Sequence, residues 1–222
     1  MSKQRGFIPF KQTSFSQPEM MKRAEALYQF SNQRRSIRDF SDKDVPFEVI
    51  KNIVLTAGTS PSGAHKQPWT FCIIRSNELK SKIKTAAEEE EYKSYHGRMS
   101  EQWLEDLKTF GTDWNKPFIE TAPWIIVVFK RIFEFEENEK RPNYYVNESV
   151  GIACGLLINA IHNAGLATLT HTPSPMNFLT EILERPENEK PYLLLPIGYA
   201  ARDAKVPNID RKTFEEVAIL FD

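Results

Sequence analysis

Apolar residues along this chain of 222 residues follow two kinds of pattern. Spacings of three and four residues predict amphipathic helices, and short runs of β-branched and aromatic residues predict buried strands. The predicted helices cover residues 18–33, 46–57, 77–91, 103–110, 146–164 and 178–183. The predicted strands cover residues 69–74, 124–130, 167–172 and 192–199. Residues 1–17 have no sustained period, so we expect an extended N-terminal arm.

Residue types at the boundaries agree with several of these elements. Pro46 stands in the first turn of the second helix and Gly58 just beyond its end, where these residues are common. Ser76 can cap the third helix, because a serine side chain accepts a hydrogen bond from a backbone N–H of the first turn. Residues 60–63, Ser-Pro-Ser-Gly, predict a turn before the first strand.

Strands separated by long helices indicate an α+β or α/β fold with helices on both faces of a sheet. The composition does not change abruptly anywhere in residues 1–222, so we expect a single domain. Residues 88–118 are unusually polar, and residues 200–222 contain few core-type side chains. The last segment could therefore extend onto a second subunit.

Composition and charge exclude several classes of protein. Hydrophobic residues make up 41% and charged residues 27% of the chain, as in ordinary folded proteins. The net charge is −1, so there is no global basic field for nucleic-acid or anionic-membrane binding. No apolar run could span a bilayer, and no signal peptide is evident. We expect a soluble, cytoplasmic protein.

Cysteine and histidine positions predict no metal site. Cys72 and Cys154 lie in apolar runs, which is typical of buried free thiols. The four histidines match no zinc-binding spacing; they are His65, His96, His162 and His171. His65 has no nucleophile with an orienting carboxylate at a recognisable spacing, so we interpret it as loop structure.

Two groups of polar residues are candidates for binding. Arg34, Arg35, Ser36 and Arg38 supply three guanidinium groups and a hydroxyl, which suit a phosphate or the polar rim of a flavin. A solvated basic turn is the alternative.

The second group is Glu91, Tyr95 and Lys116. Glu91 and Tyr95 are four residues apart and share one helical face. Glu91 could meet the ammonium group of a free amino acid, and Lys116 and Tyr95 its carboxylate. A solvated acidic helix with an exposed lysine is the alternative.

The basic segment 34–38 and the Pro-Ser-Gly-Ala-His-Lys-Gln-Pro-Trp sequence at 61–69 together resemble the nitroreductase superfamily of FMN enzymes. Further stretches resemble its iodotyrosine deiodinases: Glu88–Glu91, Tyr95, Trp114–Lys116, Thr121–Pro123, Ile152–Leu157, Asn163–Leu166 and Leu194–Tyr199. The resemblance covers residues 30–215. Animal members carry an N-terminal membrane anchor that this sequence lacks, which implies a soluble, bacterial-type form.

This resemblance implies an α-β-α sandwich with a mixed central sheet, formed as a domain-exchanged homodimer with shared active sites. It implies FMN as the cofactor. The expected FMN-binding residues are Arg34, Arg35, Ser36, Arg38, Pro61, Ser62, Thr170, His171, Thr172 and Arg211. Pro61 and Ser62 would act across the subunit interface. Without the resemblance, Arg211 is better explained by a surface ion pair.

The resemblance also implies particular roles near the reacting groups. The hydroxyl of Thr172, the expected catalytic residue, would lie near flavin N5 and favour one-electron reduction; strand propensity alone is the alternative reason for a threonine there. Ala64 would bind the phenolate oxygen of a halotyrosine through its backbone N–H. Glu91, Tyr95 and Lys116 would bind the zwitterion, on a lid of residues 88–118 that closes over substrate.

The expected activity is FMN-dependent reductive dehalogenation of 3-iodo-L-tyrosine, and of bromo- and chlorotyrosine, to L-tyrosine and halide. The expected electron donor is external: NAD(P)H acting through a reductase, or a flavodoxin- or ferredoxin-type protein. One alternative is an NAD(P)H-dependent nitroreductase or quinone reductase, which would have no use for the zwitterion-binding residues. The other is a flavin-binding or flavin-sensing protein that is not an enzyme.

Overall fold

The computed structural model describes residues 6–136 and 139–221 and divides into two compact units at Arg34/Arg35. The first unit contains helix α1 (Gln17–Asn32), which has no buried residue. Residues 6–16 before it are neither helix nor strand, as predicted for the arm, whose residues 1–5 lie outside the described part of the chain. Within residues 6–136 and 139–221, each helix is too short or too polar to span a bilayer.

The second unit is built on a four-stranded sheet in the order β1-β2-β6-β5. Its strands are β1 (Trp69–Ile74), β2 (Trp124–Arg131), β5 (Ala167–Thr168) and β6 (Glu189–Gly198). All three neighbouring pairs are antiparallel, and a single parallel bridge from Ser36 to Thr168 makes the edge mixed. β5 is shorter than the predicted strand 167–172, because pairing with β6 stops at Thr168 and resumes as one bridge at His171.

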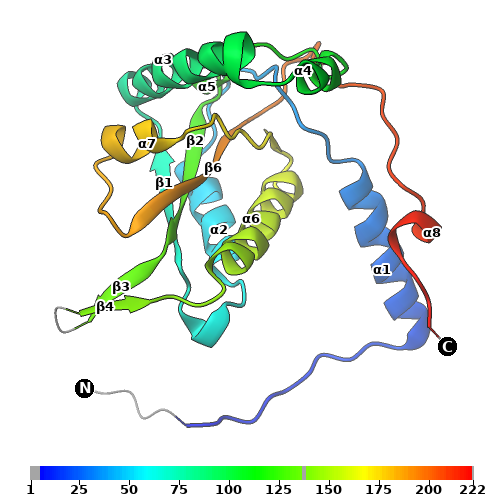
Figure 1. Ribbon diagram of the computed structural model, residues 1–222. Coiled ribbons are helices and arrows are strands. Elements are labelled where there is room, and N and C mark those ends of the chain that lie inside the picture. Colours follow the sequence, from blue (N-terminus) through cyan, green and yellow to red (C-terminus); the bar gives the residue numbers. More distant parts are fainter. Residues whose placement is uncertain (1–5, 137–138, 222) are drawn as a thin grey trace. The chain divides into compact units, whose positions relative to one another are not determined.

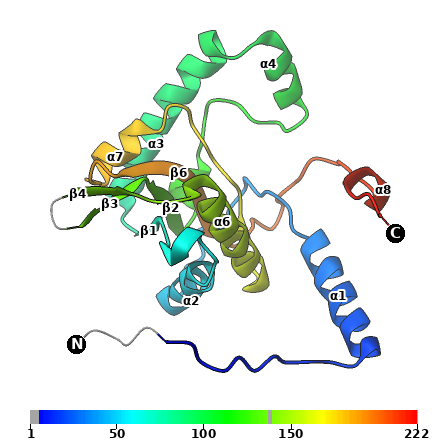
Figure 2. The ribbon, with the colours of Figure 1, turned by 60° about the horizontal axis from the view of Figure 1, so that its bottom comes forward.

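Helices cover both faces of this sheet (Figures 1 and 2). α2 (Phe47–Gly58) and α6 (Val146–Asn163) pack on one face against alternate residues of β2 such as Ile126 and Val128. α3 (Asn77–Lys93), α5 (Phe118–Thr121) and α7 (Asn177–Ile182) pack on the other face, against Ile125 and Val127. A strand buried on both faces reads as a continuous apolar run, which is why β2 could be predicted.

The remaining elements lie outside these layers. They are the one-turn helix η1 (Gly63–His65), the π-helical turn η2 (Ser94–Arg98), α4 (Glu101–Lys108), the hairpin strands β3 (Phe133–Glu136) and β4 (Glu139–Pro142), and α8 (Phe214–Val217). The hairpin and the π-helical turn were not predicted from the sequence.

Candidate active site

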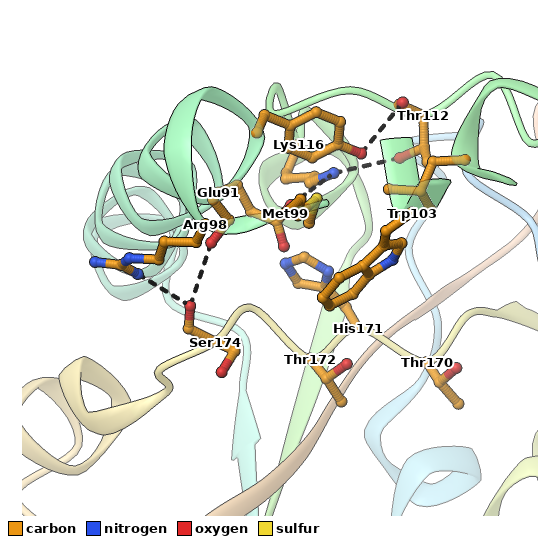
Figure 3. A pocket seen from close by; sticks show the side chains of 13 residues that line it. Glu91, Arg98, Met99, Trp103, Thr112, Lys116, Thr170, His171, Thr172 and Ser174 are labelled. Atoms are coloured by element: carbon orange, nitrogen blue, oxygen red, sulfur yellow. Dashed lines mark hydrogen bonds and ion pairs between the residues drawn. The ribbon is translucent and has the colours of Figure 1, made fainter. Parts of the chain in front are cut away.

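A cavity of about 270 Å³ is lined by the polar segment 88–118 on one side and by the residues after β5 on the other (Figure 3). The polar segment contributes Glu91, Ser94, Tyr95, Arg98, Met99, Trp103, Leu107, Thr112 and Lys116. The other side contributes Thr170, His171, Thr172 and Ser174. The structure therefore brings together the three expected zwitterion-binding residues and the expected Thr-His-Thr flavin contacts.

The C-terminal end of α3 positions Glu91 and Tyr95. The helix continues directly into the π-helical turn η2, so Tyr95 follows Glu91 on the same side of the chain. Single π-helical turns are frequent at functional sites. The chain then turns at Ser100, whose Oγ accepts a hydrogen bond from the Trp103 N–H at 3.2 Å and so caps α4.

Lys116 reaches Glu91 because the segment after α4 folds back onto α3. The Lys116 N–H donates to Glu88 Oε1 at 2.7 Å, which fixes the backbone. Lys116 Nζ then lies 3.4 Å from Glu91 Oε2 and 3.3 Å from Thr112 Oγ1, and it donates to the Asp113 carbonyl. The predicted proximity of Lys116 and Glu91 is confirmed.

Tyr95 belongs to the same cluster. Its hydroxyl donates to the Thr112 carbonyl at 3.2 Å, and Lys116 Nζ lies 5.5 Å from the centre of its ring. An anion, a hydroxyl and a cation thus converge on one end of the cavity.

Burial dominates the electrostatics of this cluster. It raises the pKa of Glu91, an effect that Lys116 opposes. It lowers the pKa of Lys116, an effect that Glu91 opposes and Arg38 reinforces. Burial also raises the pKa of the Tyr95 hydroxyl. The charged forms of this pair depend on each other, since water is largely excluded from both.

Successive side chains on the opposite wall, at Thr170, His171 and Thr172, point in alternating directions. Thr170 and Thr172 are exposed, whereas His171 between them is buried. In Figure 3 the His171 ring points toward Glu91 and Lys116, and the two threonine side chains point the other way. The threonine hydroxyls and the imidazole therefore lie on opposite sides of this segment.

Two contacts tie the polar segment to this wall. Arg98 Nη1 donates to the Ser174 carbonyl at 3.2 Å, and Ser94 Oγ donates to the same oxygen at 3.4 Å. Arg98 also pairs with Glu90 at 2.7 Å. These contacts hold η2 above the chain that carries Thr172.

The basic segment runs beside the same wall. Ser36 forms the parallel bridge with Thr168, and the Ile37 N–H donates to the Thr168 carbonyl at 3.2 Å. The charge of Arg38 acts on the pKa of Tyr95, Lys116 and His171, so this guanidinium belongs to the surroundings of the cavity. Arg35 donates to the Pro207 carbonyl.

The loop carrying Pro61, Ser62 and Ala64 does not contribute to the lining of this cavity within the described chain. Its backbone is unusual, with positive φ at Ala64 (48°), His65 (55°) and Gln67 (49°). Ser62 Oγ accepts a hydrogen bond from the Gln67 N–H at 2.9 Å and so holds the loop in this shape. Residues other than glycine adopt such angles at a cost, often at functional sites.

Two predicted arginines lie elsewhere in the chain. Arg34 is the last residue of the first unit, and Arg211 is an exposed residue of the C-terminal segment before α8. Neither lines the cavity of the second unit as the described residues define it.

Comparison with known proteins identifies the family. The model of the nitroreductase family matches residues 32–199. The chain belongs to the nitroreductase family. An iodotyrosine deiodinase of Haliscomenobacter hydrossis is 54% identical over 222 residues, which are 100% of both chains. The human iodotyrosine deiodinase 1 is 44% identical over 214 residues, covering 96% of this chain and 74% of the human one.

One similar solved structure is of an oxidized iodotyrosine deiodinase bound to FMN and 3-iodo-L-tyrosine. It aligns with a TM-score of 0.74 and 27% identity over 85% of this chain and 96% of that chain. This nitroreductase-family chain thus shares the fold expected from its sequence.

Some residues of the cavity of this nitroreductase-family protein were not predicted. Ser94, Arg98 and Ser174 form the link between the two walls, and Met99 and Trp103 supply apolar lining. The sequence offered one signal, the amphipathic stretch containing Trp103. The contacts to Ser174 join residues about eighty positions apart, for which no local pattern exists.

Proposed function

We propose that this protein is an FMN-dependent reductive dehalogenase that converts 3-iodo-L-tyrosine, and its bromo and chloro analogues, to L-tyrosine and halide. The convergence of Glu91, Tyr95 and Lys116 opposite Thr172 in one cavity carries this proposal. A carboxylate, a hydroxyl and an ammonium group complement the zwitterion of a free amino acid. The relatives named iodotyrosine deiodinase support the same substrate class.

In this proposal each charge of the existing ion pair finds an opposite charge on the substrate. Glu91 binds the ammonium group, and Lys116 and Tyr95 bind the carboxylate. The backbone N–H of Ala64 binds the phenolate oxygen; no hydrogen bond within the described chain uses this N–H. Because segment 88–118 carries three of these groups, it acts as a lid that orders around substrate and excludes water.

The residues present fit FMN. Arg35 and Arg38 offer guanidinium groups for a phosphate, together with the Ser36 hydroxyl on the segment that pairs with Thr168. The exposed side chains of Thr170 and Thr172 point away from the zwitterion cluster, as hydroxyls serving a flavin should. Arg34, Arg211, Pro61 and Ser62 complete the proposed set. Bound and reduced, FMN supplies the two electrons that, with a proton, replace the carbon–halogen bond by a carbon–hydrogen bond.

We also propose a homodimer with shared active sites, in a single-domain subunit of residues 1–222 whose arm (1–17) and C-terminal extension (200–222) pack on the partner subunit. Exposed apolar side chains in each segment support this proposal. They are Phe7, Ile8 and Phe10 near the N-terminus, and Phe214, Val217, Ile219, Leu220 and Phe221 near the C-terminus. An external donor reduces the flavin: NAD(P)H through a reductase, or a flavodoxin- or ferredoxin-type protein.

Substrate selectivity tests this function. Turnover of 3-iodo-L-tyrosine and of 2-iodophenol is measured with dithionite as reductant, and turnover of 4-nitrophenol with NADPH. We expect iodide release from iodotyrosine to exceed that from 2-iodophenol by far, because only iodotyrosine has the zwitterion that the lid binds. Equal rates for the two iodinated compounds, or turnover of nitrophenol alone, would refute the proposal.

A further inference from the structure

His171 is a cavity residue whose hydrogen bonding is incomplete. The residue is 7% exposed, and its Nε2 atom is buried without a hydrogen-bond partner in the described part of the protein. Buried polar atoms are nearly always paired, because an unpaired one has lost its hydration without compensation. A partner from outside the chain is the simplest way to complete this site.

Backbone pairing and one ring contact position His171. The backbone N–H of His171 donates to the Leu194 carbonyl at 2.9 Å, and the backbone N–H of Leu194 donates to the His171 carbonyl at 3.0 Å. The ring meets the Phe118 ring edge to face, with centres 5.4 Å apart. In this position the ring points toward Glu91 and Lys116 (Figure 3).

The surroundings keep this imidazole neutral. Burial, followed by the charges of Lys116 and Arg38, lowers the pKa of His171 to about 3. Glu91 is the acidic group on the facing lid, and its own pKa is raised by burial. A neutral imidazole carries one N–H and one lone pair. Because its Nε2 atom has no partner in the described part of the protein, this nitrogen can carry the lone pair and accept a hydrogen bond.

The zwitterion-binding cluster and a bound amino acid together present several N–H and O–H donors. Lys116 and Tyr95 can both donate to a substrate carboxylate. The substrate ammonium group has three N–H donors, and Glu91 is the one carboxylate among the cavity residues of the described chain. Every donor of the ammonium group has to find an acceptor once the lid excludes water, and the unpaired Nε2 of His171 offers one on the wall that faces Glu91.

We propose that His171 Nε2 accepts a hydrogen bond from the α-ammonium group of the substrate, beside Glu91. His171 thereby becomes a specificity-determining residue for free amino acids, and its side chain serves the substrate instead of the flavin. This inference rests on the proposed function, since it concerns the same cavity and the same substrate class.

Two ligands and three forms of the FMN-loaded protein test this role. The ligands are 3-iodo-L-tyrosine and 3-(4-hydroxy-3-iodophenyl)propionate, which lacks the ammonium group. The proteins are the wild type, His171→Phe, which keeps an aromatic ring, and His171→Gln, which restores a polar group near the Nε2 position. Dissociation constants come from quenching of flavin fluorescence.

We expect His171→Phe to weaken iodotyrosine binding about ten-fold or more, as for loss of a hydrogen bond to a charged group. Binding of the propionate should be unchanged, and His171→Gln should recover most of the lost affinity. Equal weakening of both ligands, or of neither, would overturn the role of His171. A wild-type protein that does not bind iodotyrosine would instead refute the proposed function.

A measurement on the wild type covers the case in which the variants do not fold. In FMN-loaded protein labelled with ¹⁵N-histidine, the Nε2 resonance of His171 should be that of an unprotonated nitrogen. Saturating iodotyrosine should shift it in the direction of an accepted hydrogen bond. An Nε2 signal that does not move on saturation, or that already belongs to a protonated nitrogen, would overturn the inference.

Discussion

Lys116 Nζ lies 3.4 Å from Glu91 Oε2 inside the cavity, and the two side chains are only 4% and 11% exposed. Isolated burial of either charge would be costly, so each residue is the other's counter-ion. An amino-acid zwitterion can replace both partners at once, because it brings an ammonium group for Glu91 and a carboxylate for Lys116. The pair is thus suited to a ligand that carries both charges.

Removing either charge should weaken halotyrosine binding. Charge-assisted hydrogen bonds contribute roughly 1.5 to 3 kcal/mol each, so Lys116→Ala or Glu91→Gln should weaken binding about ten-fold or more. FMN affinity should barely change. Quenching of flavin fluorescence measures both quantities.

Glu89→Gln is the matched control for this comparison. Glu89 is an exposed residue on the same helix and borders a different surface groove, with Tyr92 and Trp114. Its replacement should leave halotyrosine affinity unaltered. Unchanged affinity in both the Glu91 and the Lys116 variants would show that the zwitterion binds elsewhere.

As the pH is lowered, halotyrosine binding should begin to weaken at a higher pH than the titration of an exposed glutamate would produce. Burial raises the pKa of Glu91, whereas an exposed glutamate titrates at about 4.3. As pH falls through this raised pKa, Glu91 becomes neutral and the attraction for the ammonium group is lost. Affinity should therefore be complete above this pKa and decline below it.

The dissociation constant of iodotyrosine, measured against pH in the wild type and in Glu91→Gln, tests this assignment. The variant should bind more weakly at neutral pH and lose the acidic decline. An identical acidic decline in both proteins would assign the titrating group to another residue.

The loop before β1 should not tolerate a side chain at Gly63. A Cβ there would lie 2.9 Å from the Tyr144 carbonyl oxygen and 3.0 Å from the Tyr145 ring. Gly63→Ala should therefore displace the neighbouring Ala64, weaken halotyrosine binding and lower the melting temperature.

Gly58→Ala is the control for this change. A Cβ at Gly58 would meet nothing within 4 Å, and the residue ends α2. Alanine has the higher helix propensity, so this variant should be neutral or slightly stabilising. The melting temperature and the halotyrosine affinity are measured for both variants. If Gly63→Ala matches Gly58→Ala in both quantities, a Cβ at Gly63 does not clash with Tyr144 and Tyr145.

Thr172→Ala should impair deiodination more than hydride-type reduction of nitrophenol. A neutral hydrogen bond contributes roughly 0.5 to 1.5 kcal/mol, which is enough for a several-fold change in rate without loss of the fold. Thr172→Ser keeps the hydroxyl and should retain the wild-type ratio of the two activities. If the alanine variant has the same ratio as the wild type, the Thr172 hydroxyl has no role in selecting the chemistry.

Local patterns in the sequence predicted most of the layers. The spacing of Ile50, Ile53 and Ala57 with Pro46 and Gly58 at the ends located α2, and the predicted strand 69–74 coincides with β1. These elements are recognisable because their burial is regular. The proximity of Glu91 and Lys116 was expected from the resemblance to the deiodinases, whereas the residue pattern alone favoured a solvated acidic helix with an exposed lysine.

The direction of His171 could not be predicted in the same way. The predicted strand 167–172 is interrupted after Thr168, and the face on which His171 lies depends on its bridge to Leu194 and its ring contact with Phe118. The hydrogen bond from Arg98 to Ser174 likewise depends on tertiary packing. The β3–β4 hairpin was missed because the Phe-Glu-Phe-Glu alternation of β3 spans only four residues and β4 is polar and exposed throughout, so neither gives a sustained strand pattern.

An anaerobic single-turnover experiment tests the central claim, that this cavity serves reductive dehalogenation of a halotyrosine, most directly. FMN-loaded protein is reduced with one equivalent of dithionite and mixed with 3-iodo-L-tyrosine, and flavin reoxidation, iodide and L-tyrosine are measured together. We expect one iodide and one tyrosine for each reduced flavin, with turnover strongly diminished in Glu91→Gln. A flavin that stays reduced, or reoxidation without iodide release, would contradict this claim.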